Sequence, residues 1–179
     1  PFGAHICVTQ VDTDTGFVKI RDYFGVDDCG PVINPTIVDG QLHGGIAQGV
    51  AKALYEEAIY DEEGNLTTGS MVDYLVPGAP ELPNYTLERT ETPSTSNEMG
   101  VKGIGEAGTI GAPPAVINSI VDALSPYGIT HIDMPASPWK VWQAIQDAQG
   151  QEAGTRDADR SGRPSQAVDS TDTEGGSVS

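Results

Sequence analysis

Residues 39–54, DGQLHGGIAQGVAKAL, decide the fold, because apolar side chains recur in them at steps of three and four. This spacing is typical of the buried face of an amphipathic helix. The apolar positions are Leu42, Ile46, Val50, Ala53 and Leu54. Asp39 suits an N-cap, so we expect a helix over about 40–57 that packs this face against the rest of the domain.

A second face of this helix combines glutamines with glycines. Each glycine costs roughly 1 kcal/mol relative to alanine in a helix, so three of them indicate that something approaches the backbone closely. The glutamine amides could bind a heterocycle edge or an oxo group, and a helix N-terminus could bind an anion such as phosphate. The alternative is a closely packed second helix, with the glutamines in solvent. The residues concerned are Gln41, Gly44, Gly45, Gln48 and Gly49.

Strand patterns lie on both sides of this helix. Residues 5–11 and 17–26 are rich in β-branched and aromatic side chains and flank a turn at 12–16, which predicts a β-hairpin. After the helix we expect a second hairpin, 57–60 with 66–68, and then an irregular, proline-rich stretch over 69–84. The remaining expected elements are a strand over 85–91, a glycine-rich loop over 93–112, a helix over 113–124, a short strand over 129–132 and a helix over 138–147.

Interleaved strands, hairpins and helices predict an α+β fold for residues 1–147. Pro113 and Pro114 suit the first turn of the helix expected over 113–124. Residues 148–179 contain no aromatic residue, leucine or isoleucine. Such a segment buries too little apolar surface to offset the entropy of ordering, so we expect a disordered acidic tail.

The charge of the chain excludes several kinds of partner. It has 26 acidic and nine basic residues and a formal net charge of −17, which disfavours nucleic acids and anionic membranes. Residues 1–147 hold 20 of the acids and six of the bases, a net charge of −14, so the acidity belongs to the folded part. We interpret it as a solvated acidic surface adapted to high salt, so low salt should destabilise the assembled protein, and an acidic patch for a basic partner is the alternative.

The ends and the cysteines of the chain complete this picture. No apolar run approaches the roughly 20 residues of a membrane span, and the N-terminus does not resemble a signal peptide, so we expect a cytoplasmic protein. Cys7 and Cys29 form no CxxC pair and support neither a disulfide scaffold nor a zinc or iron–sulfur site. Because the first residue is Pro1 and not Met, we expect a fragment or a processed chain.

The glycine-rich segment 100–111 carries a single carboxylate, Glu106. Gly103, Gly105 and Gly108 satisfy the spacing GxGxxG, but no buried strand precedes them, so we reject a dinucleotide-binding site. A carboxylate held between glycines in a dry pocket can act as a general base. The alternative is an acid that interacts with the dipole of the following helix.

Several motifs in the same order resemble the xanthine oxidase family of molybdenum hydroxylases. The resemblance covers residues 1–147 and points to the second molybdopterin-binding domain, the C-terminal part of the large subunit. Large chains of aerobic carbon monoxide dehydrogenase and of aldehyde or xanthine dehydrogenase are similar. The motifs are GVDDCG at 25–30, GQLHGGIAQG at 40–49, GSMVDY at 69–74, ETP at 91–93 and GVKGIGEAG at 100–108.

The resemblance implies a role for particular residues. Glu106 matches the family's general base, which activates a hydroxyl bound to molybdenum, and Gln41 matches a glutamine that contacts the cofactor. No residue of the chain is expected to ligate the metal itself. The other residues expected at the cofactor are Gly44, Gly45 and Gln48, with the backbone of Lys102, Gly103 and Gly105.

The resemblance also implies cofactors, partners and substrates. The cofactor is molybdenum-molybdopterin, expected in the cytosine dinucleotide form. Partners are the upstream part of the large subunit, an iron–sulfur small subunit and an FAD medium subunit, without which the fragment should be inactive. The continuation Ala107-Gly108-Thr109 departs from the carbon monoxide dehydrogenases and favours an aldehyde or N-heterocycle as the small-molecule substrate. A non-catalytic cofactor-binding or scaffold domain is the alternative.

Overall fold

The computed structural model describes residues 1–161, with side chains for residues 1–150. Its sheet has three strands, in the order β1 (Phe2–Val11), β2 (Val18–Asp28) and β3 (Tyr85–Thr90). β1 and β2 pair antiparallel, which confirms the hairpin, and β3 pairs parallel to β2. A parallel pair needs a long crossover, and here the crossover contains a helix.

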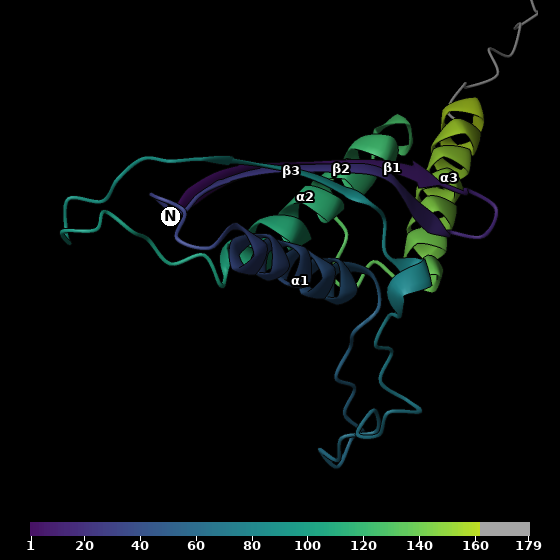
Figure 1. Cartoon of the computed structure of the whole chain (residues 1–179). Helices are drawn as coiled ribbons and strands as arrows, with labels where there is room; N and C mark the ends of the chain where they lie inside the picture. The colour runs from purple at the N-terminus through teal and green to yellow at the C-terminus, as the bar shows by residue number, and fades with distance from the viewer. Residues whose placement is uncertain (162–179) are drawn as a thin grey trace, which may run out of the picture.

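Helices cover one face and one end of this sheet (Figure 1). α1 (Pro35–Leu54) and α2 (Ala107–Ala123) lie side by side beneath the sheet, and α3 (Pro138–Ser161) stands at the end where the β1–β2 turn lies. This arrangement confirms the α+β class. None of the helices in residues 1–161 combines the length and the hydrophobicity that a membrane span requires.

The main core lies between α1, α2, α3 and the inner face of the sheet. All five residues of the apolar stripe expected on α1 are buried, as the spacing predicts. Leu42 lies in a smaller cluster with Cys29 and Val38, and the other four pack with side chains of α2, α3 and β2. The principal members of the main cluster are Tyr23, Ile46, Val50, Val116, Ile120, Val141 and Ile145.

α1 begins earlier than the sequence predicted. Asn34, not Asp39, is the N-cap: its Oδ1 accepts a hydrogen bond from the Ile37 amide at 3.2 Å, and Pro35 follows in the first turn. Asp39 lies inside the helix and forms an ion pair with Arg89. The apolar stripe gives no information on the first turn of the helix, because that turn is mostly exposed.

This cap gives a stability prediction. Asn34→Ala should lower the free energy of unfolding by about 1 kcal/mol, because it leaves an amide of the first turn without its acceptor. Asn34→Asp keeps a capping oxygen and should change stability little. Urea unfolding of the assembled large subunit, followed by hydrogen exchange of the α1 amides, measures both variants. Equal stability of Asn34→Ala and the wild type would contradict the assignment of the cap.

α2 also begins early, at Ala107 instead of residue 113, so Pro113 and Pro114 lie in its interior. The prediction of the prolines in the first turn was therefore wrong. The extra N-terminal turn is stabilised by close packing on α1: a methyl group built on Gly108 would lie 2.8 Å from both Leu42 O and Ile46 N. This contact outweighs the hydrogen bonds that the prolines cannot donate.

The second expected hairpin is present only in a minimal form, and one expected strand is absent from the described residues. The chain reverses at 61–65, as predicted, but residues 57–60 and 66–68 pair only through an antiparallel bridge of Tyr60 with Leu66 and a hydrogen bond from the Thr67 amide to Ile59 O at 2.8 Å. An isolated short hairpin is only marginally stable, and this one extends away from the sheet within the arm formed by residues 56–84 (Figure 1). Residues 129–132 form no strand. The irregular stretch within 69–84 holds only a short 3₁₀ turn, Ala79–Glu81.

α3 begins at Pro138, as expected, and its backbone continues to Ser161. It therefore enters the segment that the sequence predicts to be a disordered tail. Residues 162–179 of that segment lie outside the described residues, and a domain boundary at residue 147 stays a prediction.

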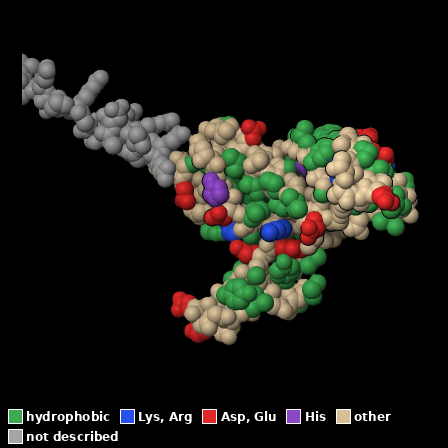
Figure 2. Space-filling model, turned by 90° about the vertical axis from the view of Figure 1, so that its left-hand side faces the viewer, with side chains coloured by type: hydrophobic (Ala, Val, Ile, Leu, Met, Phe, Trp, Pro, Cys, Tyr) green, Lys and Arg blue, Asp and Glu red, His purple; other side chains and the backbone are tan. Residues whose placement is uncertain are grey.

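The outer face of the sheet and the arm expose many apolar side chains. On the sheet, Ile6 is 63% and Phe24 is 42% exposed, and on the arm Val72 is 90% exposed. Figure 2 shows hydrophobic side chains on the body and along the arm below it. Apolar surface of this extent is typical of a part that packs against further protein.

Candidate functional site

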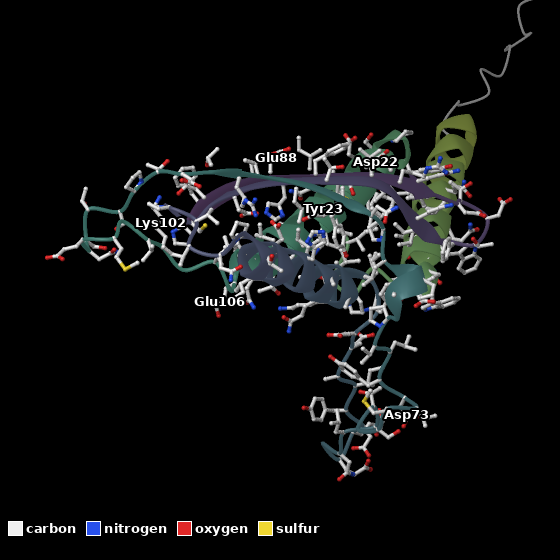
Figure 3. All side chains as sticks on the ribbon, in the orientation of Figure 1. Asp22, Tyr23, Asp73, Glu88, Lys102 and Glu106 are labelled. Atoms are coloured by element: carbon white, nitrogen blue, oxygen red, sulfur yellow. The ribbon has the colours of Figure 1, made fainter. Side chains whose placement is uncertain are left out.

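The candidate site is built around the residue that precedes α2. Glu106 is the N-cap of this helix, and its backbone carbonyl accepts a hydrogen bond from the Ile110 amide at 3.0 Å. Its carboxylate makes no capping bond to α2 and is exposed, so residues 1–161 alone do not enclose it in a dry pocket. Figure 3 shows Glu106 at the end of the α1–α2 pair, pointing away from the body.

The packing of α1 on α2 brings Gln41 beside the loop that precedes α2 and contains Glu106. A methyl group built on Gly105 would lie 3.4 Å from Gln41 Oε1, so the glutamine amide contacts the residue next to Glu106. Gln41 is exposed and comes from α1, whereas Gly105 precedes α2. The structure therefore brings Gln41 and Gly105 close together, two predicted site residues that are 64 positions apart in the sequence.

The other α1 candidates fall into two groups. Gly45 is buried, and a methyl group there would lie 3.0 Å from the Thr109 amide nitrogen, so helix packing explains this glycine. Gly49 likewise contacts Ala112 and Pro113. In contrast, Gly44 is exposed with nothing within 4 Å of an added methyl group, and Gln48 is also exposed. Close packing of a second helix, the alternative offered for these glycines, therefore holds for Gly45 and Gly49, whereas a ligand at Gly44 and Gln48 stays a prediction.

The loop before α2 presents open backbone on one side. Gly103 and Gly105 are exposed, and nothing lies within 4 Å of a methyl group built on Gly103. The Lys102 amide donates a hydrogen bond to Cys29 O at 2.8 Å, so it is not free for a ligand. Its side chain reaches Asp28, with 2.7 Å between Nζ and Oδ1.

Asp28 is a buried acid that the sequence reasoning missed. Burial raises its pKa, but hydrogen bonds from Lys102, Gly30, Thr92 and Thr90 outweigh this effect and hold the pKa well below its usual range. The carboxylate is therefore ionised at neutral pH. The only signal in the sequence was the pair of adjacent acids, Asp27 and Asp28, at the end of the strand.

A second buried network lies behind the α2 N-terminus. His5 bonds to Tyr23 through Nδ1 at 2.7 Å and to Asp27 through Nε2 at 3.1 Å. Burial, together with the charges of Cys7, Asp27 and Tyr85, raises the pKa of Tyr23 above its usual range, so the phenol stays neutral. The His5 ring lies 2.9 Å from a methyl group built on Gly111, so it packs directly on α2.

The residues around Glu106 fit a cofactor that is organic, anionic and able to form hydrogen bonds. The side-chain amide of Gln41 offers donors and an acceptor, and the backbone at Gly103, with nothing within 4 Å of an added methyl group, is open to a ligand at close range. The positive end of the α2 dipole lies at the same point and favours anions. All of these groups lie on one exposed end of the α1–α2 pair, beside Glu106.

Comparison with known proteins identifies relatives over most of the chain. The family described as "Molybdopterin cofactor-binding domain" matches residues 1–83. The nicotine 6-hydroxylase large subunit of Paenarthrobacter nicotinovorans is 44% identical over 165 residues, 90% of this chain and 20% of that protein. The carbon monoxide dehydrogenase large chain of Hydrogenophaga pseudoflava is 39% identical over 147 residues, 82% of this chain and 18% of that protein.

A solved structure agrees with these relatives. The reconstituted carbon monoxide dehydrogenase from Oligotropha carboxidovorans has a TM-score of 0.81 and 38% sequence identity. The match covers 84% of this chain and 19% of that one. The chain thus spans about a fifth of the length of the relatives that it matches.

Proposed function

Because the chain belongs to the xanthine oxidase family of molybdenum hydroxylases, as part of a large subunit, we propose that Glu106 is the general base of a molybdenum cofactor-dependent oxidoreductase. The observation that carries this proposal is the exposed carboxylate of Glu106 at the α2 N-terminus, next to Gly105, where an added methyl group would lie 3.4 Å from Gln41 Oε1. When bound, the molybdenum cofactor supplies the two-electron oxidation of the substrate.

The chain's own residues bind and orient the reacting groups. Gln41 donates hydrogen bonds from its side-chain amide, and Gly103 and Gly105 let the cofactor approach the backbone. Gly44 and Gln48 extend the same exposed surface along α1. Glu106 accepts a proton on a carboxylate oxygen, with water as the source of the oxygen that enters the product. Gly45 and the Lys102 amide contribute indirectly, through packing and loop geometry.

The substrate we favour is an N-heterocycle or an aldehyde. The continuation Ala107-Gly108-Thr109 supports this choice over carbon monoxide. The relative named as a nicotine 6-hydroxylase supports it as well, because nicotine contains an N-heterocycle. We also propose the cytosine dinucleotide form of the cofactor, iron–sulfur and FAD partner subunits that carry the electrons away, and a cytoplasmic location in salt-rich conditions.

Molybdenum content tests the proposal against a metal-free scaffold. The assembled enzyme should contain about one molybdenum per large subunit, and Gln41→Ala should lower that content because it removes the amide that holds the cofactor. Elemental analysis of the purified assembly measures both. Lys52→Ala, an exposed change on the same helix, is the control and should retain the metal. A well-folded assembly without molybdenum would support the scaffold alternative and overturn the proposal.

Residues 1–147 alone should have no activity. The apolar outer face of the sheet and the arm would then lie in water instead of against the rest of the subunit. The site around Glu106 would also lack the upstream part of the subunit that we expect to cover it, since the described residues leave Glu106 exposed.

A further inference from the structure

The carboxylate of Asp28 lies at the end of β2 and is completely buried, with 0% of the residue exposed. Its two oxygens accept four hydrogen bonds. Oδ1 accepts from Lys102 Nζ at 2.7 Å and from the Gly30 amide at 3.0 Å. Oδ2 accepts from Thr90 Oγ1 at 2.9 Å and from the Thr92 amide at 2.7 Å. A single side chain thus joins β2, the end of β3 and the loop that leads to α2.

Lys102 is fastened to the same place by other contacts. Its amide donates to Cys29 O at 2.8 Å, and its ammonium lies 4.8 Å from the centre of the Phe2 ring. A methyl group built on Gly30 would lie 2.3 Å from Gly100 O, so the two loops touch through their backbones. The first residues of the 100–106 segment therefore have one defined position against the sheet.

The far end of this segment is the candidate catalytic residue. Only three residues separate Lys102 from Glu106, and two of them are Gly103 and Gly105, which have exposed, open backbones. Figure 3 shows Lys102 and Glu106 at the same end of the molecule. Because glycines fix so little of the backbone by themselves, the placement of Glu106 depends on three anchors: the Lys102 ion pair, Ile104, which packs against the cluster of Cys29, Val38 and Leu42, and the α2 helix.

We propose that Asp28 is a positioning residue, which holds Lys102 and through it sets the place of Glu106 and of the cofactor-facing backbone at Gly103 and Gly105. This inference rests on the proposed function of Glu106. A buried ion pair with all its hydrogen bonds satisfied specifies one geometry, whereas loss of one partner leaves an uncompensated charge. A small displacement of a reacting group is sufficient to reduce turnover substantially.

The test uses Asp28→Asn in the assembled holoenzyme. The asparagine amide must face either the Lys102 and Gly30 donors or the Thr92 donor, so one set of hydrogen bonds is lost. Turnover should fall roughly 10–100-fold, with KM changed less than about threefold and molybdenum content retained. Hydrogen exchange at residues 100–106 should rise, while exchange in β1 and the second half of α1 stays as in the wild type.

Matched variants separate positioning from general damage. Asp22→Asn removes an exposed acid of the same strand and should leave turnover and exchange unchanged (Figure 3). Lys102→Met should reproduce the effect of Asp28→Asn, and Lys102→Arg, which keeps the charge, should retain most of the turnover. The double variant Asp28→Asn/Lys102→Met should lose less than the product of the two single losses.

The outcomes distinguish this inference from the proposed function. Unchanged exchange at residues 100–106 and unchanged kcat in Asp28→Asn would overturn the positioning role, even if Glu106 proves essential. Increased exchange at this segment in a metal-loaded enzyme whose turnover does not depend on Glu106 would instead overturn the role of Glu106. Loss of exchange protection throughout the subunit would assign Asp28 to general stability and also overturn the inference.

Discussion

Glu106→Gln in the assembled enzyme should lower kcat/KM by roughly 10²–10⁴-fold, the range that a general base contributes. The amide has nearly the shape of the carboxylate but accepts no proton at neutral pH. The site should keep its geometry, because the Glu106 carboxylate makes no capping bond to α2 that the change could break. Steady-state kinetics with an N-heterocycle or aldehyde substrate would measure the loss.

The control is Glu88→Gln, which removes an exposed carboxylate from β3 and should leave turnover unchanged (Figure 3). Molybdenum content must be equal in both variants and in the wild type, so that the comparison concerns the base and not cofactor loading. The role assigned to Glu106 fails if the metal-loaded Gln variant turns over at the wild-type rate.

Periodicity predicted the elements that bury one face. The five-residue stripe of α1 and the first hairpin are where the pattern placed them, because each faces the core. Periodicity failed where contacts between distant segments determine where an element begins or whether it forms. The first turn of α2 depends on the contact of Gly108 with α1, and the prolines six residues later predicted a different start. The 57–60 and 66–68 segments, predicted as the arms of a hairpin, have no sheet to join and form only one bridge.

The site shows the same division between local and distant signals. Glu106 and Gln41 could be selected from short motifs, because each motif is contiguous in the sequence. Asp28 could not, since its partner Lys102 lies 74 positions away and a buried ion pair leaves no spacing pattern. Gly45 and Gly108 are explained only when the two helices are seen in contact, which is also how Gln41 reaches Gly105.

That helix contact supports the second large prediction. Gly108→Ala should destabilise the α1–α2 pair, although alanine gains about 1 kcal/mol in helix propensity over glycine. The added methyl group would lie 2.8 Å from Leu42 O and from Ile46 N, which are backbone atoms within α1. They can move away only if the helices separate, and overpacking of this kind costs about 1–3 kcal/mol or more. We therefore expect a net loss of about 1–2 kcal/mol.

Gly40→Ala is the matched control, because it makes the same chemical change in α1 with nothing within 4 Å of the new methyl group. Only the propensity gain applies there, so stability should rise by about 1 kcal/mol. Hydrogen exchange of the α1 and α2 amides in the assembled subunit measures both changes as local free energies of opening. Opposite signs for the two substitutions follow only if the helix backbones are in contact at Gly108. A stabilising Gly108→Ala would mean that the contact holding Gln41 against Gly105 is looser than these distances require.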